Sequence, residues 1–205
     1  MRALVRVLCV VITCVAGIAG VPVYIADAHA ASPAAELVGE ARRALDAGRI
    51  DEALPLLQRA VAADGNDPAA LAWLGNAQVR KARTVSFIDA SAWVKRGFNT
   101  LDEAVERFPD AFVVYLVRGI TSLNVPDMFG KREVAVQDLR AVLSMRAKSA
   151  QAVPDVVMPS VYLNLGQAYK KVGKTADARA VWEQGRQAHP GAPETKTIEN
   201  ELKRL

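Results

Sequence analysis

The feature that most constrains the fold of this chain is a helical spacing of apolar residues that continues along nearly all of it. Beyond residue 30, apolar residues recur three or four positions apart, which is the period of an amphipathic α-helix. No run of alternating apolar and polar residues between turn signals, the pattern of a half-buried strand, interrupts them. We therefore predict an all-α fold.

A longer period is superimposed on the helical one, and it is clearest at residues 159–192. Its large residues, small residues, turn glycine and final proline are Tyr162, Leu165, Gly166, Tyr169, Gly173, Ala178, Trp182, Gly185 and Pro190. These spacings resemble the tetratricopeptide repeat, a helix–turn–helix unit of about 34 residues. Gly185 departs from the motif, because Ala is usual there, but a glycine still permits a close helix approach. The resemblance implies a right-handed α-solenoid.

Three less faithful units precede this one. Their matching residues are Gly48, Ala53, Leu57 and Ala60 in the first, Leu71, Leu74, Gly75, Gly97, Leu101 and Ala104 in the second, and Tyr115, Gly119, Ala135, Leu139 and Val142 in the third. We place the four repeats at residues 34–67, 68–111, 112–158 and 159–192. A last helix at 193–205 carries an apolar face and is expected to cap the solenoid, whose final repeat would otherwise expose its own.

Residues 1–30 have the layout of a secretory signal peptide. Arg2 and Arg6 precede an uncharged stretch at 7–25, and small residues lead to an expected cleavage after Ala30. We expect an exported protein, periplasmic or secreted, whose mature domain spans 31–205 and contains no integral membrane span. The alternative is that the apolar stretch is retained as a membrane anchor, since it is about as long as a short span.

The composition argues against several classes of function. The 26 Lys and Arg residues exceed the 22 Asp and Glu residues only slightly, and no basic run is longer than two, which argues against nucleic-acid binding. Both cysteines lie within 1–30, and His189 is the only histidine beyond it. We find no nucleophile motif, zinc cluster or glycine-rich phosphate loop. We therefore expect no enzyme, no cofactor and no metal, with His189 as an exposed residue at a helix end.

In proteins that carry this repeat, the first helices of successive units line a concave groove for an extended peptide or a helix. The resemblance places the following candidates in the groove: Arg42, Asn76, Arg80, Leu116, Asn164, Gln167, Lys170 and Lys171. An amphipathic middle and a basic end suit a segment with apolar anchors and some negative charge. The alternative for Lys170 and Lys171 is a solvated helix face.

Two segments are longer than the motif requires, at residues 83–91 and 124–133. Both fall between the two helices of a unit, so in a solenoid they lie on the same edge and should be neighbours. Their apolar residues either bury each other or expose a patch to a partner. The candidates for this insert-edge surface are Phe87, Ile88, Met128 and Phe129.

The three tryptophans are interpreted mainly as structural. We expect Trp182 in the core of the last repeat and Trp93 at the start of the second helix of repeat two. Trp73 lies beside the core-facing positions, so it either contacts a neighbouring helix or is partly accessible.

These patterns together predict a non-enzymatic interaction scaffold or adaptor of the bacterial cell envelope. By analogy with exported members of the family, its partner is another envelope protein or a peptide segment. Two alternatives stay open: a ligand-binding accessory component of a transport system, with a pocket under the two inserts, and a membrane-tethered scaffold.

Overall fold

A computed structural model describes residues 32–205 of the chain. The signal-peptide prediction for residues 1–30 lies outside these residues. The described part contains α-helices and two short 3₁₀ turns and no strand, so the prediction of an all-α fold is confirmed. The helices are α1 (Pro33–Asp46), α2 (Ile50–Ala63), α3 (Pro68–Lys81), α4 (Phe87–Arg107), α5 (Phe112–Leu123), α6 (Arg132–Lys148), α7 (Met158–Lys171), α8 (Thr175–Ala188) and α9 (Pro193–Leu202). None of them is both long and apolar enough to cross a membrane.

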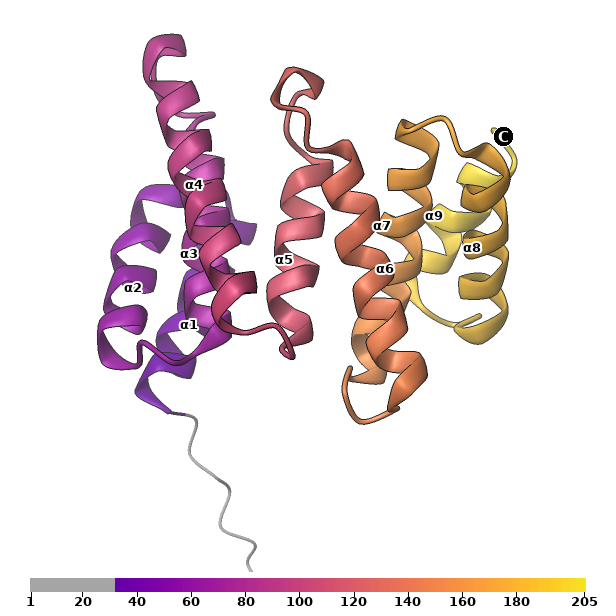
Figure 1. Cartoon of the computed structure of the whole chain (residues 1–205), viewed down its shortest axis with the longest axis horizontal. Helices are drawn as coiled ribbons and strands as arrows, with labels where there is room; N and C mark the ends of the chain where they lie inside the picture. The colour runs from indigo at the N-terminus through magenta and orange to yellow at the C-terminus, as the bar shows by residue number, and fades with distance from the viewer. Residues whose placement is uncertain (1–31) are drawn as a thin grey trace, which may run out of the picture. The chain divides into compact units, whose positions relative to one another are not determined.

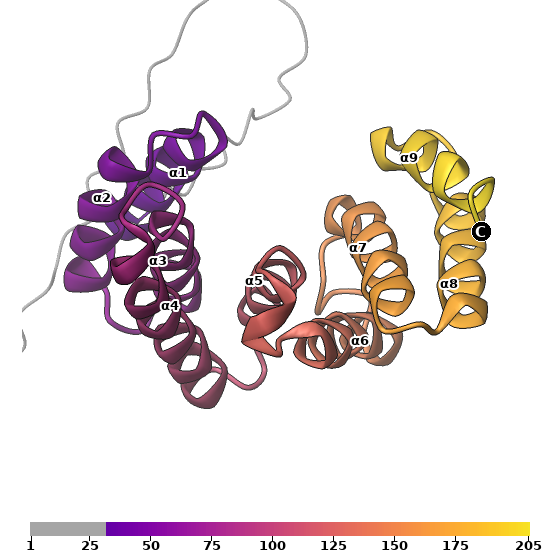
Figure 2. The same ribbon diagram turned by 90° about the horizontal axis from the view of Figure 1, so that it is seen from above.

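The helices of residues 32–205 are arranged as antiparallel pairs in two layers. α1 packs on α2, α3 on α4, α5 on α6 and α7 on α8 (Figure 1). The first helices of the pairs also contact one another in order, and α9 packs against both α7 and α8 (Figure 2). We call the layer of α1, α3, α5 and α7 the first-helix layer and that of α2, α4, α6 and α8 the second-helix layer. This is the stacking of an α-solenoid.

Local signals in the sequence explain where the first helices begin and end. Ser32 accepts a hydrogen bond from the backbone N–H of the third residue after it, and Asp67 caps α3 in the same way. Each cap is followed by a proline, which is suited to the first turn of a helix. Gly48 and Gly173 follow α1 and α7 with φ of 76° and 79°, a conformation that favours glycine and reverses the chain towards the second helix.

Close contact between small and large residues joins the helices of the last pair. Trp182 is fully buried, as predicted, and its indole N–H donates to the carbonyl of Leu163 at 3.0 Å. A Cβ atom at Gly166 would overlap with this indole ring. A Cβ atom at Gly185 would lie 2.5 Å from Cβ of Tyr162, which accounts for glycine at a position where the motif usually has alanine.

The segment at 83–91 is not the apolar loop that we expected, and Trp93 does not open a helix. α4 begins at Phe87 and is 21 residues long, so most of the extra residues add turns to its start. The Ser86 hydroxyl accepts from the backbone N–H of Asp89 and donates to its carboxylate at 2.7 Å. A serine that exchanges hydrogen bonds with the residue three positions later is a helix-start signal, and here it starts α4 at Phe87, before Trp93.

The segment at 124–133 stays outside the regular helices. It contains a 3₁₀ turn at Asp127–Phe129 and then Gly130 with φ of 63°, before α6 begins at Arg132. Val125 and Phe129 are half-buried against the cluster of side chains between α3, α4 and α5. This segment is therefore fastened to the body of the solenoid.

The contact between Gly166 and Trp182 gives a test of the packing. We expect Gly166→Ala to lower the free energy of unfolding by about 1–3 kcal/mol, because the added methyl group must displace a buried indole. Gly39→Ala is the matched control: its Cβ would have no neighbour closer than 3.8 Å, so it should stabilise α1 by about 0.5–1 kcal/mol. Urea unfolding followed by circular dichroism measures both. Equal effects of the two variants would contradict this account.

Candidate functional site

Arg42 lies exposed on the first-helix layer and is held against an aromatic ring of the next repeat. Its guanidinium carbon is 4.9 Å from the ring centroid of Trp73 in α3. Trp73 itself is half-buried against the side chains of α1 to α5, which confirms that it contacts neighbouring helices. A guanidinium over an indole face is attracted by the ring quadrupole. Arg42 is thus positioned in advance and still accessible.

Asn76 does not line an open groove, contrary to our expectation. It is buried, and its amide Nδ2 donates to the Thr121 hydroxyl of α5 at 2.7 Å, while that hydroxyl donates to the carbonyl of Val117. The Asn76 Oδ1 atom has no hydrogen-bond partner within residues 32–205. Asn76 is therefore used to join α3 to α5 and is not available to a binding partner.

Arg80 and Lys171 are also occupied by the chain itself. Arg80 Nη2 donates to the carbonyl of Leu45, near the end of α1, and Lys171 Nζ donates to the carbonyl of Leu123 at the end of α5, 2.6 Å away. The last carbonyls of a helix lack intrahelical partners and carry partial negative charge, so a cation stabilises them. Each of these residues thus caps the preceding first helix.

The remaining groove candidates differ in how open they are. Lys170 is exposed and pairs with Glu201 of α9 at 2.7 Å, and Asn164 donates to the carbonyl of Ser160 in its own helix. Gln167 is half-buried, and its side chain makes no hydrogen bond within the described part of the chain. Leu116 is half-buried against the cluster between α5 and α9.

An apolar strip remains on the first-helix layer at its last two helices, α5 and α7. Leu116, Ile120 and Leu163 are all half-buried there, on α5 and α7. We call this group, with Arg42 and Gln167, the first-helix face. It combines apolar side chains that are not fully covered with one exposed cation and one amide.

The insert edge exposes two large apolar side chains. Ile88, at the start of α4, is 84% exposed, and Met128, in the turn between α5 and α6, is 80% exposed. Both segments lie at the same edge of the solenoid (Figure 1). Phe129 packs inward, and the side chain of Phe87 lies outside the described part of the structure. The second segment contacts α4 through Lys131, whose ammonium is 4.3 Å from the ring centroid of Phe98.

Arg118 forms a buried ion pair within the third helix pair and a second, more exposed ion pair with α4 of the second helix pair. The Arg118 guanidinium of α5 donates to both carboxylate oxygens of Asp138 in α6, each at 2.8 Å, and to Asp102 of α4 at 2.8 Å. Burial raises the pKa of Asp138, against the opposite influence of Arg118. The hydrogen bond from Arg118 to Asp138 raises the pKa of the guanidinium. This arrangement holds three helices together and is a structural feature.

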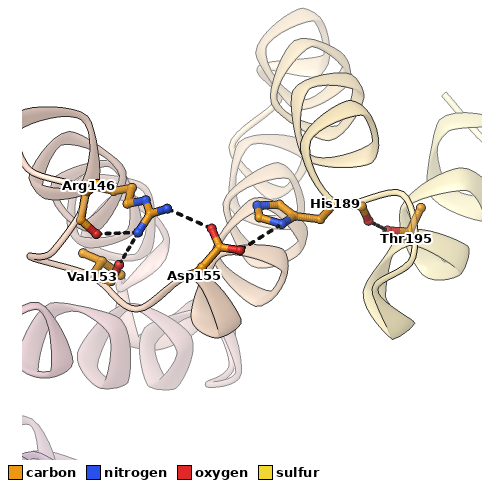
Figure 3. A network of polar contacts seen from close by, with 6 residues as sticks. Arg146, Val153, Asp155, His189 and Thr195 are labelled. Carbon is orange, nitrogen blue, oxygen red and sulfur yellow. Dashed lines mark hydrogen bonds and ion pairs between the residues drawn. The ribbon is translucent and has the colours of Figure 1, made fainter.

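His189 lies at the end of α8, as predicted, but it is not exposed. Its side chain is 16% exposed, and its ring lies beside Tyr162, with 5.8 Å between ring centroids. Figure 3 shows its place in a polar network: Arg146 binds one oxygen of Asp155 at 2.8 Å, and the other oxygen lies 3.9 Å from His189 Nδ1. The His189 carbonyl accepts from the Thr195 hydroxyl at 2.6 Å. The network ties the segment after α6 to the turn between α8 and α9.

Residues 32–205 contain no group of three or more His, Cys, Asp or Glu side chains placed to hold a metal ion. The candidate sites that the geometry offers are surfaces, namely the first-helix face and the insert edge. Stacked helix pairs with such a surface define an α-solenoid of helix–turn–helix repeats.

Comparison with known families agrees with this class. Two family models, both described as tetratricopeptide repeat, match residues 38–91 and 159–184. The chain is a tetratricopeptide repeat protein. No curated protein matches the sequence.

Solved structures with a similar fold include a tetratricopeptide repeat protein and MamA proteins. A thermophilic TPR protein of Thermus thermophilus, TTC0263, is 17% identical with a TM-score of 0.50, over 84% of this chain and 100% of that one. A mutant of MamA is 22% identical with a TM-score of 0.51, over 80% of this chain and 83% of that one. The MSR-1 form of MamA is 21% identical with a TM-score of 0.51, over 83% and 97%. These likenesses concern the fold.

The structural role of Asn76 can be tested with a pair of substitutions. Thr121→Val removes the acceptor and leaves the Asn76 amide buried without a partner, so we expect a loss of about 1–3 kcal/mol in unfolding free energy. The double variant Asn76→Leu with Thr121→Val replaces both partners by apolar groups and should recover part of that loss. Urea unfolding of the single and double variants measures the coupling. Strictly additive effects would contradict a direct bond between the two side chains.

Proposed function

We propose that this chain is an envelope scaffold that binds a segment of a protein partner on its first-helix face. The repeat family and the fold support a protein–protein interaction scaffold in general. The observation that carries the more specific proposal is the half-buried strip of Leu116, Ile120 and Leu163, which the chain's own helices cover only in part.

The chemistry of the face defines the kind of segment that fits it. Apolar side chains at i, i+3 and i+4 of an amphipathic helix, or alternate side chains of an extended peptide, fill a strip of this kind. Arg42 carries a positive charge on α1, at the N-terminal end of the same layer, and Gln167 of α7 offers both a donor and an acceptor. We infer that the partner segment has apolar anchors and at least one acidic residue placed towards Arg42.

The proposed work is binding without a reaction of its own. Proteins of this family are generally non-catalytic scaffolds. Beyond residue 30 the sequence has a single histidine and no cysteine, so the common nucleophiles and general bases are few. In the structure that histidine packs beside Tyr162 and Asp155, within a network that holds helices together.

The insert edge is proposed as a second contact surface for the same or another partner. Ile88 and Met128 are both largely exposed and lie at one edge, whereas Phe129 is packed inward. Single exposed apolar residues are common on protein surfaces, but two at the same edge of the solenoid can contact one partner together.

Photo-crosslinking tests the first-helix face. With benzoylphenylalanine replacing Gln167, we expect ultraviolet light to link the full chain to one protein of the envelope. The matched control replaces Gln187, an exposed glutamine of α8 in the second-helix layer. Adducts are identified by mass spectrometry after purification from cells of the source organism. The same adduct from both positions, or none from Gln167, would argue against binding on this face.

The envelope location gives a separate prediction. If residues 1–30 are removed by signal peptidase, the protein recovered from cells begins at Ala31. N-terminal sequencing and intact mass of the protein purified from the envelope fraction measure this directly. A chain that retains the residues at 7–25 and sediments with membranes would instead support the membrane-tethered scaffold.

A further inference from the structure

A cleft of about 640 Å³ opens between α6 and α8, with α7 as its floor. We call it the outer cleft. Its floor consists of Tyr162, Leu165 and Tyr169. Its walls, on α6 and α8, carry Leu143 and Val181 together with small, polar and charged side chains, among them Arg146, which is bound to Asp155. Its volume lies within the range of about 300–1,000 Å³ that is usual for ligand sites in proteins.

The outer cleft lies on a different side of α7 from the first-helix face. Successive helical residues turn by about 100°, so the side that carries Tyr162, Leu165 and Tyr169 is nearly opposite the side that carries Leu163 and Gln167. The cleft is therefore independent of the binding surface proposed above.

Four exposed polar side chains line the cleft and have no partner in the described part of the chain. Among residues 32–205, the side chains of Arg140, Ser144, Asp177 and Gln184 line the cleft and make no hydrogen bond or ion pair. A largely apolar cleft with a few convergent polar groups is the usual form of a binding site.

The two ends of the cleft carry different side chains because of the order of the helices. α6 and α8 run antiparallel to α7, so Arg140, Tyr169 and Asp177 lie towards one end, with opposite charges on opposite walls. Tyr162 and Gln184 lie towards the other end. The lining residues cover about two helical turns, or roughly 10 Å, the length of about three residues of extended chain.

We propose that the outer cleft binds a short extended peptide segment of a protein partner, with an apolar side chain on its floor and an acidic and a basic side chain near Arg140 and Asp177. A peptide backbone requires donors and acceptors along its length, and Ser144 and Gln184 on opposite walls supply them. Opposite charges on the two walls favour an occupant that carries both signs.

The test is selection of peptides from a displayed library of random heptapeptides against the full chain, followed by measured affinities of the enriched peptides. Ala180→Phe fills the cleft from its exposed wall. Ala176→Phe is the matched control, because Ala176 is an exposed alanine of the same helix that does not line the cleft. We expect enriched peptides to contain an apolar residue beside an acidic and a basic one. Their affinity should fall by about tenfold or more in Ala180→Phe alone.

A charge-reversed pair keeps the proposal testable if Ala180→Phe disturbs the fold. Arg140→Glu changes an exposed side chain, so it should leave the circular dichroism spectrum unchanged while weakening the selected peptides. A peptide with lysine in place of its acidic residue should recover binding to Arg140→Glu. No enriched peptide, or peptides that bind Ala180→Phe and Arg140→Glu as tightly as the parent chain, would overturn the proposal.

Discussion

The close approach of two helices at a residue without a side chain is the constraint on which the rest of this solenoid depends. Gly166 leaves the space that the Trp182 indole fills, and Gly185 leaves the space for Tyr162. At α3 and α4 the two backbones themselves approach each other, since a Cβ at Gly97 would lie 2.6 Å from the carbonyl oxygen of Gly75. Interiors packed at this density tolerate little change in volume, so the α3/α4 and α7/α8 pairs are each held in one fixed geometry.

Stacking the helix pairs requires a second kind of contact, which is polar and joins one repeat to the next. Arg80 and Lys171 bind carbonyls at the end of the preceding first helix, and Arg118 links α4, α5 and α6 through two carboxylates. Asn76 joins α3 to α5 through Thr121. Helix ends and buried polar groups must find partners, and in a row of similar helices the nearest partner belongs to the neighbouring repeat.

This difference between packing and polar contacts explains what the sequence could predict. The all-α class, the repeat family and the burial of Trp182 depend on spacings of small and large residues, which are local and regular. The roles of Asn76, Arg80 and His189 depend on contacts between neighbouring helices. The spacing of residues along one helix does not predict these contacts. Hydrophobic spacing alone does not reveal that α4 begins as early as Phe87. The local signal for this start is the pair Ser86 and Asp89.

The residues that take part in neither kind of contact are those that can determine which partner binds. A side chain that caps a neighbouring helix cannot be redirected to a ligand without a cost to the stack, since it would leave a carbonyl unpaired. Among residues 32–205, four side chains make no hydrogen bond to the backbone of another repeat: Arg42, Gln167, Arg140 and Asp177. In repeat proteins the core can therefore stay nearly constant while recognition changes, because the two tasks are assigned to different positions of the same helices.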